Sequence, residues 1–250
     1  MNSEDPLPAK SKKFNFLEGE VLLIDKPTDW TSFDIVNKLR FRLKKALGVK
    51  KIKVGHAGTL DPMATGLLIV CTGKATKTID SYQAQEKTYT GTIGFGGTTP
   101  SYDLETEIEQ EYPYDHITAE AIEEVIQAQF SGKIEQIPPM FSAIKVDGQP
   151  LYKRARKGQE IEVKPRPVEI YEFKNTGLEL PEMNFEIKCS KGTYIRSIAN
   201  DIGKALNSGG HLRALRRTMI GEYHVKDAWD IEELCNYLEN EYIPENLSNQ

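Results

Sequence analysis

The chain has 250 residues, of which 39% are hydrophobic, so it is long enough to bury a sizeable core. The sequence contains no apolar run near the ~18 residues that a membrane span needs, and its N-terminal residues are polar, so we expect neither a membrane segment nor a signal peptide. The three cysteines lie far apart and the four histidines are scattered. This argues against a disulfide framework or a metal site and favours a reducing cytoplasm.

The net charge of −5 at pH 7 argues at first against a nucleic-acid partner, but the charges are unevenly distributed. Basic side chains run from Lys38 to Lys53 with no acid among them, and further basic groups lie between 145 and 166 and between 213 and 217. One such run is typical of a solvated helix face. Because local fields decide where a phosphate backbone can lie, the three groups together favour RNA as the partner.

The first predicted elements are a strand and a helix. Residues 1–17 have no hydrophobic periodicity and predict a flexible arm, which the short apolar strand Val21–Asp25 follows. Thr31 and Asp34 have the spacing of a helix cap in which each side chain bonds the other's backbone. The buried stripe of the helix is predicted to be Val36, Leu39, Leu43 and Leu47. Its basic residues then face largely toward solvent or phosphate.

Strands and helices alternate irregularly along the rest of the chain. Further strands are predicted at Gly66–Cys71, Tyr89–Phe95, Val168–Phe173 and Met183–Ser190. Further helices are predicted from the Thr118 cap to Gly132, at Tyr194–Leu206, and at Ile231–Tyr242 behind the Asp230 cap. No repeat interrupts this order, and the pattern by itself supports a fold of mixed α and β structure.

One carboxylate, Asp61, stands in the glycine-rich segment GHAGTLDPMATG, directly before an apolar strand. The glycines let the backbone turn tightly and approach a ligand, and Pro62 fixes the backbone angle φ immediately after the acid. An Asp before Pro ordinarily caps a turn. The alternative is a reactive group that a stiff loop holds against a rigid strand.

The segment GHAGTLDPMATG resembles the active-site motif of the TruB family of pseudouridine synthases. Other segments resemble further motifs of that family in the same order: EVLLIDKPTDWTSFD from Glu20, EKTYTG from Glu86, PPMFSAIKVDG from Pro138, LYKRARKG from Leu151, KGTYIRSIANDI from Lys191 and HLRALRR from His211. Together the matches extend over residues 18–225. Because they recur independently along the chain, we identify it as a member of this family.

The resemblance implies an α+β pseudouridine synthase fold, with a mixed, largely antiparallel central sheet and flanking helices. The expected domains are the arm at 1–17, a catalytic domain at 18–225 and a short acidic helical tail at 226–250. A loop at 137–158 would grip the RNA. Bacterial family members commonly carry a C-terminal PUA domain. The tail is too short for one, so we expect it to be absent.

The resemblance also assigns roles to particular residues. Asp61 matches the catalytic nucleophile and Arg196 the arginine that pairs with it. Tyr89 matches the tyrosine that stacks on the flipped base, and its part in proton transfer is left open. His56 matches the residue that fills the vacated stack. From the residues alone, Arg196 would be a surface helix arginine, Tyr89 a core aromatic and His56 a hydrogen-bonded loop histidine.

The remaining assignments concern the substrate pocket. Tyr194 and Leu215 match positions that line it, which in physical terms is nearly the same claim as core packing. Lys26 is grouped with the substrate-binding residues, although its position favours support of the loop over chemistry. Asp103 lies where this sequence departs from the family's pattern, so it is given only a weak role.

The implied activity is isomerisation of uridine to pseudouridine at position 55 in the T-loop of tRNA. Asp61 would attack C1′ or C6, and no cofactor or metal is required because every substrate atom is retained. The expected partner is the T-arm of tRNA, without a guide RNA, and the protein is expected to be a cytoplasmic monomer. The alternatives are a tRNA-folding chaperone, or modification of another RNA such as a guide complex or an mRNA loop.

Overall fold

The computed structural model describes residues 14–159 and 161–243. The chain divides into two compact units, made of the described parts of 1–85 with 216–250 and of 86–215. We call these unit 1 and unit 2. The sequence predicts a single catalytic body over 18–225, so the division is a difference from that prediction. None of the helices in the described part of the chain combines the length and apolar character that crossing a bilayer requires.

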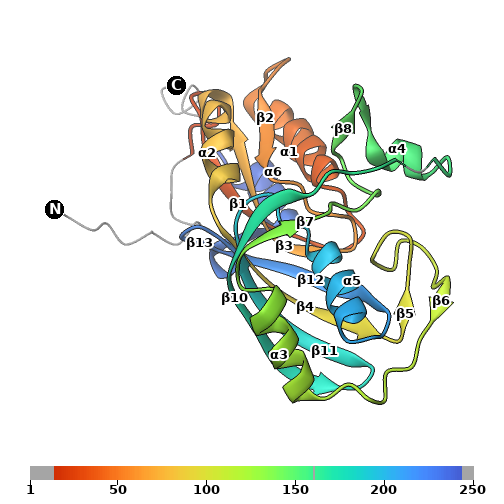
Figure 1. Cartoon of the computed structure of the whole chain (residues 1–250). Helices are drawn as coiled ribbons and strands as arrows, with labels where there is room; N and C mark the ends of the chain where they lie inside the picture. Colours follow the sequence, from red (N-terminus) through yellow and green to blue (C-terminus); the bar gives the residue numbers. More distant parts are fainter. Residues whose placement is uncertain (1–13, 160, 244–250) are drawn as a thin grey trace. The chain divides into compact units, whose positions relative to one another are not determined.

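Unit 1 contains both ends of the described chain. Its strands are β1 (Val21–Lys26), β2 (Val54–Ala57), β3 (Thr65–Thr72), β13 (Tyr223–His224), β14 (Trp229–Asp230) and the part of β12 (Gly210–Ile220) from Arg216 onward. Its helices are α1 (Ser32–Leu47), α2 (Ile79–Ala84) and α6 (Ile231–Asn240), with 3-10 turns at Gly73–Thr78 and Val225–Asp227. The strand order is β14-β1-β3-β12, and β2 also pairs with β3 (Figure 1).

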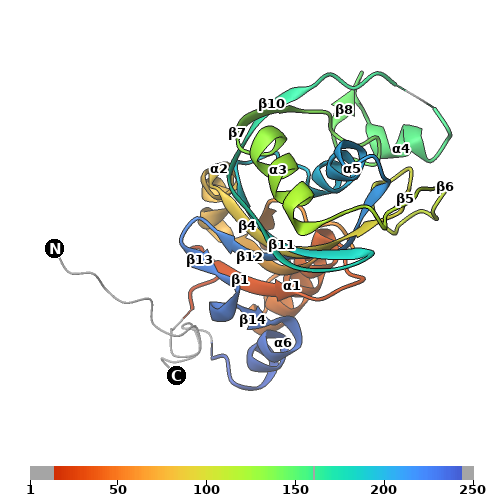
Figure 2. The ribbon, with the colours of Figure 1, turned by 60° about the horizontal axis from the view of Figure 1, so that its bottom comes forward.

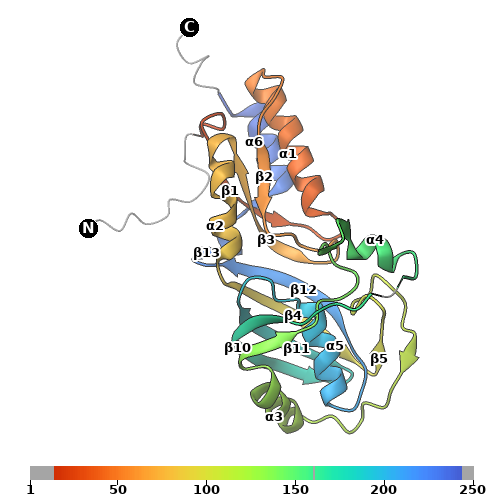
Figure 3. The same cartoon turned by 45° about the horizontal axis from the view of Figure 1, so that its top comes forward.

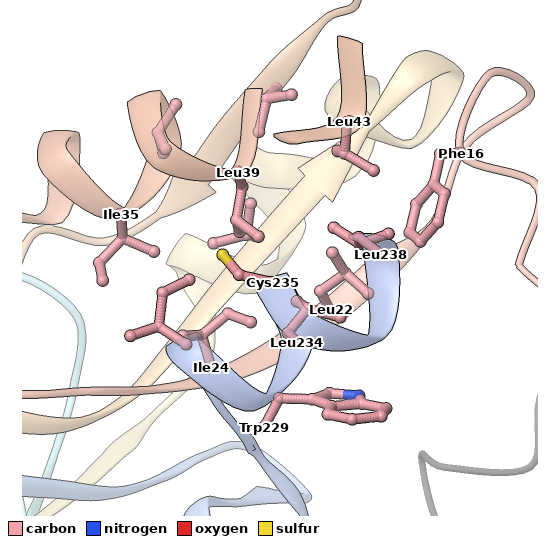
Figure 4. Packing of buried hydrophobic residues seen from close by; sticks show 14 of the residues in the cluster. Phe16, Leu22, Ile24, Ile35, Leu39, Leu43, Trp229, Leu234, Cys235 and Leu238 are labelled. Atoms are coloured by element: carbon pink, nitrogen blue, oxygen red, sulfur yellow. The ribbon is translucent and has the colours of Figure 1, made fainter. Parts of the chain in front are cut away.

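The strand β3 is the centre of unit 1, because both of its faces are buried. Leu68 and Val70 face the cluster formed with α1 and α6, whereas Leu67, Ile69 and Cys71 face the cluster beside α2. A strand covered on both faces reads as a continuous apolar run, as the sequence predicts here. Figure 3 shows α1 and α6 side by side, and Figure 4 shows the cluster that they close.

Helix α1 begins where the sequence predicts. The Thr31 side chain accepts a hydrogen bond from the Asp34 backbone N–H, and the Asp34 carboxylate accepts one from the Thr31 N–H. Gly48 ends the helix in the left-handed conformation, with φ of 65°. Ile35, Val36, Leu39 and Leu43 are buried, whereas Leu47 only packs against the rim of the cluster.

The first described residues belong to the core of unit 1. Phe14 and Phe16 are buried in the cluster of α1 and α6, and Phe16 contacts Tyr242 edge to face. The arm predicted over 1–17 is therefore wrong for residues 14–17, because two aromatic side chains have apolar surface to bury there. Residues 1–13 lie outside the described part of the chain.

Unit 2 contains the longest strands of the protein. They are β4 (Lys87–Phe95), β5 (Gly97–Thr98), β6 (Gln110–Glu111), β7 (Gly132–Gln136), β8 (Lys145–Val146), β9 (Gln149–Pro150), β10 (Arg166–Glu179), β11 (Glu182–Cys189) and β12 up to Leu215. The helices are α3 (Ala119–Gln129), α4 (Leu151–Ala155) and α5 (Ile195–Ala205). The main sheet has the order β12-β4-β11-β10-β7, and its β4/β11, β10/β11 and β7/β10 pairs are antiparallel.

One face of the unit 2 sheet carries helices α3 and α5, as Figures 1 and 2 show. The strand sequences explain this, because alternate residues of β4 and β11 are buried. Tyr89 and Ile93 are register partners of Ile187 and Met183, and all four are buried. Thr92 and Asn184 point the other way and hydrogen-bond to each other. Sequence and structure thus agree on a mixed, largely antiparallel α+β fold.

Candidate active site

The loop that carries Asp61 joins β2 to β3 in unit 1, and four hydrogen bonds restrain it. The Ser32 hydroxyl accepts from the Leu60 N–H at 2.9 Å and donates to the Leu60 carbonyl at 3.2 Å. The Asp29 N–H donates to the Pro62 carbonyl at 2.9 Å, and the Ala64 N–H donates to the Asp61 carbonyl at 3.0 Å. Asp61 itself is half-buried. The loop is therefore stiff, as the sequence predicts.

Lys26 supports this loop through hydrogen bonds from its buried ammonium. Its side chain is fully buried, and its ammonium donates to the carbonyls of Pro27, Trp30 and Pro62 at 2.8, 2.6 and 3.3 Å. An ammonium has three protons to donate, and three backbone carbonyls receive them. Burial lowers the pKa of Lys26 to about 8, against the opposing effect of the Asp61 charge. This geometry favours support of the loop over substrate binding.

Arg217 is a residue of this site that the sequence analysis missed. It was grouped with the basic residues that face RNA, but its side chain is only 1% exposed. Its Nε donates to the Leu67 carbonyl at 2.8 Å and its Nη2 to the Gly58 carbonyl at 3.1 Å. The sequence signal for this close contact is Gly66. Only a glycine fits there, since a Cβ would lie 2.3 Å from the Arg217 carbonyl oxygen.

His56 lies on β2 opposite Val70 and just before the loop. Burial is the main cause that lowers its pKa, and the charge of Arg217 adds to it, whereas a hydrogen bond with the Gly58 backbone opposes them. At neutral pH the ring is therefore uncharged. A flat neutral ring suits the role of a wedge in a base stack, which stays a prediction.

Unit 2 holds Arg196, Tyr194, Tyr89 and Leu215. Arg196 is the second residue of α5, and its side chain is 4% exposed. Its guanidinium donates to the carbonyls of Ser101 and Phe141 at 3.1 and 2.8 Å. Its Nε lies 3.5 Å from a carboxylate oxygen of Asp103, which is also buried. The alternative of a surface arginine is therefore wrong. Asp103 has a structural role that its altered sequence context concealed.

The start of α5 is fixed by a residue that the sequence analysis did not single out. Gln136, buried at the end of β7, donates to the Tyr194 carbonyl at 3.1 Å and accepts from the Tyr194 N–H at 2.8 Å. Tyr89 is 9% exposed on the helix-covered face of the sheet, and Leu215 is half-buried on β12. Tyr89 and α5 thus lie on the same side of the unit 2 sheet.

The predicted site residues fall into two sets. Asp61, His56 and Lys26 belong to unit 1, and Arg196, Tyr89, Tyr194 and Leu215 belong to unit 2. Pairing of Asp61 with Arg196 joins one set to the other and stays a prediction. Among residues 14–159 and 161–243, no group of three or more His, Cys, Asp or Glu side chains is placed to hold a metal ion.

Comparison with known families identifies the chain. The model of the N-terminal domain of TruB family pseudouridylate synthases matches residues 44–195, and that of the C-terminal domain of tRNA pseudouridylate synthase B matches residues 196–249. The chain therefore belongs to the TruB family of pseudouridylate synthases. The family resemblance inferred from the sequence is confirmed.

Named relatives are similar over nearly their whole length. The chain is 59% identical to tRNA pseudouridine synthase B of Flavobacterium johnsoniae over 217 residues, which is 86% of this chain and 94% of the relative. It is 54% identical to the protein of the same name from Phocaeicola vulgatus, over 92% of this chain and 98% of the relative.

A solved structure confirms the fold class. A chain in the structure of an H/ACA RNP bound to a substrate RNA containing 2′-deoxyuridine is similar to this one with a TM-score of 0.64 and 25% identity. The similarity covers 92% of this chain, which spans 57% of the length of the solved chain.

Proposed function

We propose that this protein converts uridine to pseudouridine in tRNA, at position 55 of the T-loop. Two findings support the reaction and the class of RNA. The chain belongs to the TruB family, and it is similar to relatives named tRNA pseudouridine synthase B over 94% or more of their length. The observation that carries the proposal is the half-buried carboxylate of Asp61 on a loop held at several points. Position 55 rests on the family resemblance.

In the proposed mechanism, Asp61 attacks the flipped nucleotide at C1′ of the ribose or at C6 of the ring. The glycosidic bond between N1 and C1′ breaks, the uracil turns within the site, and a bond forms between C5 and C1′. The bond between the Asp61 carboxylate and C1′ or C6 breaks as the product forms, so the free carboxylate is restored. The proton on C5 is lost and N1 regains one, so the product has the same atoms as the substrate. No cofactor enters this balance.

The other site residues prepare this step. Tyr89 stacks on the flipped base, and Tyr194 and Leu215 line its surroundings. Arg196 holds the Asp61 carboxylate ionised, since a guanidinium is always charged. His56 fills the gap that the base leaves in the RNA stack.

The loop at 137–158 provides the proposed grip on the T-arm. It contains the hairpin β8–β9 and helix α4, and Lys145, Lys153 and Lys157 on it are exposed. Arg154 and Arg156 contact Asp147 and Glu105 at 3.7 and 2.7 Å. The exposed lysines are free to approach phosphates as mobile point charges, which suits recognition of RNA by shape. We propose that the protein acts as a cytoplasmic monomer on the T-arm alone, without a guide RNA.

The test is conversion of an unmodified T-arm hairpin without added cofactor or second RNA. We expect the wild-type chain to convert the uridine equivalent to position 55, and Asp61→Asn to convert none while it binds the hairpin with similar affinity. Asp80→Asn, an exposed acid on α2, is the charge-matched control and is expected to keep full activity. Mapping the modified position in the product shows whether other uridines react.

Three results would contradict the proposal or a part of it. Binding without conversion of any RNA would favour the chaperone alternative. Conversion at a uridine outside the T-loop would favour another substrate. Conversion of whole tRNA but not of the hairpin would overturn the claim that the T-arm suffices.

A further inference from the structure

The loop that carries Asp61 has two ends, and one side chain reaches both. Gly58 follows the last residue of β2, and Leu67 lies near the start of β3. The Arg217 guanidinium donates to the carbonyls of both residues, at 3.1 and 2.8 Å. Because a guanidinium is a rigid planar fork, the two hydrogen bonds fix the separation of the two loop ends.

The backbone of Arg217 adds a third constraint at the same place. Arg217 is the register partner of Gly66 in the parallel pairing of β12 with β3. Gly66 has φ of 101°, and a Cβ on it would lie 2.3 Å from the Arg217 carbonyl oxygen and 2.8 Å from its N atom. The two chains therefore approach as closely as a glycine allows, and the start of β3 cannot shift without moving β12.

The burial of Arg217 shows that this charge does not contact RNA directly. Its side chain is 1% exposed and is among the largest fully buried side chains in the described part of the molecule. A buried charge is costly unless hydrogen bonds satisfy it, and here backbone carbonyls of the loop and of β3 do so. The neighbouring Arg216 differs, since it is 40% exposed and pairs with Asp25 at 2.6 Å.

We propose that Arg217 is a positioning residue, which holds Asp61 in its reactive place by fixing the Gly58 end of the loop against the start of β3. The inference rests on the proposed function of Asp61. Arg217 thereby contributes to the rate of the reaction without touching the RNA, because even a small displacement of a reacting group lowers the rate strongly.

The charge of Arg217 has a second effect, on His56. Burial lowers the pKa of His56, the charge of Arg217 lowers it further, and the backbone of Gly58, whose carbonyl accepts from Arg217, opposes both. Arg217 therefore acts on two residues proposed for the reaction, on Asp61 through the geometry of the loop and on His56 through its charge. The pKa of His56 provides a readout of this contact that does not depend on activity.

The test compares Arg217→Met, Arg217→Lys and the control Thr72→Val. Thr72 lies at the opposite end of β3, fully buried, where its hydroxyl accepts a hydrogen bond from the Glu20 N–H at 3.0 Å. Thr72→Val thus loses a buried hydrogen bond in the same strand without touching the loop. Four quantities are measured: the single-turnover rate constant and Kd with the T-arm hairpin, amide exchange of residues 58–64, and the pKa of His56 by NMR titration.

For Arg217→Met we expect the rate constant to fall about 100-fold with Kd nearly unchanged. Amide exchange of residues 58–64 should be faster and the pKa of His56 higher than in the wild type. Arg217→Lys keeps the charge but loses the fork, so we expect an intermediate rate, faster exchange and a pKa of His56 close to that of the wild type. Thr72→Val should lower the melting temperature and leave all four quantities unchanged.

The inference is overturned if the Arg217 variants lower only the melting temperature, as the control does, or if they raise Kd and leave the rate constant intact. Unchanged exchange of residues 58–64 in Arg217→Met would also overturn it. The exchange and the pKa are measured without RNA. A wild-type chain that converts no RNA would therefore refute the proposed function, while those two measurements still decide whether Arg217 anchors the loop.

Discussion

Lys26 shows how burial and charge compete at a single residue below the reactive loop. Its side chain is fully buried, and the three carbonyls it contacts belong to the turn after β1 and to the Asp61 loop. The family resemblance groups Lys26 with substrate binding. The sequence could not show that all three of its protons are used within the chain, because that depends on where three carbonyls of two separate turns meet.

Lys26→Met should destabilise unit 1 by about 1–3 kcal/mol at pH 7, because three buried carbonyls lose their donor. The difference between the wild type and Lys26→Met in the free energy of unfolding should grow with pH. Folded Lys26 releases its proton near pH 8 but unfolded Lys26 only near 10.5, so between these values the unfolded chain binds more protons and the wild type gains stability. Urea unfolding of both proteins from pH 7 to 10.5 measures this. A difference that stays constant or shrinks would refute the assigned pKa.

The predicted site residues differ in how much the sequence could establish about them. The loop around Asp61 could be predicted, because its glycines and Pro62 act locally on the backbone. Arg217 and Asp103 could not, because each acts through partners far away in the chain, Gly58 and Arg196. A basic or acidic residue in a short motif looks the same in sequence whether it faces solvent or a buried carbonyl.

At the scale of elements, the pair α1 and α6 alters the prediction of a basic helix face open to phosphate. Glu239 of α6 contacts Arg42 at 2.9 Å and Lys45 at 2.8 Å, and Glu232 pairs with Lys38. The hydrogen bond from Lys45 and then the charge of Arg42 hold the pKa of Glu239 below its usual value. Part of the basic face is therefore neutralised by the acidic helix.

If α1 contributes to the grip on RNA, Glu239→Gln should strengthen binding, because it releases two cations from their acid. We expect the affinity for the T-arm hairpin to rise roughly two- to fivefold at low salt, with a steeper dependence on salt concentration. Melting temperature should change little, since these pairs are exposed. Glu241→Gln is the charge-matched control, because no basic partner of Glu241 is seen in the described part of the chain. Equal effects of both variants would mean that only net charge matters.

Most elements could be predicted from local patterns, and those that could not are explained by their surroundings. The caps at Thr31, Thr118 and Asp230 are confirmed. Helix α3 ends at Gln129 rather than at Gly132, which instead begins β7. Strand β12 was missed because its buried positions include His211 and Arg217, and a strand with polar side chains on its buried face shows no apolar alternation.

At the scale of the whole molecule, the tail predicted at 226–250 belongs in part to the core of unit 1. Trp229 of β14 and four residues of α6 are buried in the same cluster as residues of β1 and α1. Figure 4 labels Trp229, Leu234, Cys235 and Leu238 in this cluster. The four α6 residues are Ile231, Leu234, Cys235 and Leu238. The sequence predicts this helix and its cap but treats it as an appendage. Amphipathic periodicity shows that a helix has an apolar face, and does not show what that face covers.

Unit 1 should therefore depend on residues after 225 for its stability. Leu234 is fully buried between α1 and β1, so Leu234→Ala should lower the free energy of unfolding by about 2–5 kcal/mol, through lost burial and the cavity it leaves. Asn236→Ala, at an exposed position of the same helix, should change it by less than about 0.5 kcal/mol.

A chain that stops after His224 should fail to fold unit 1 and lose all conversion of RNA, because the Asp61 loop begins and ends on strands of that unit. Chemical unfolding of the two variants and activity of the shortened chain measure these effects. Full activity of the shortened chain would show that the catalytic domain does end near residue 225, as the sequence motifs predict.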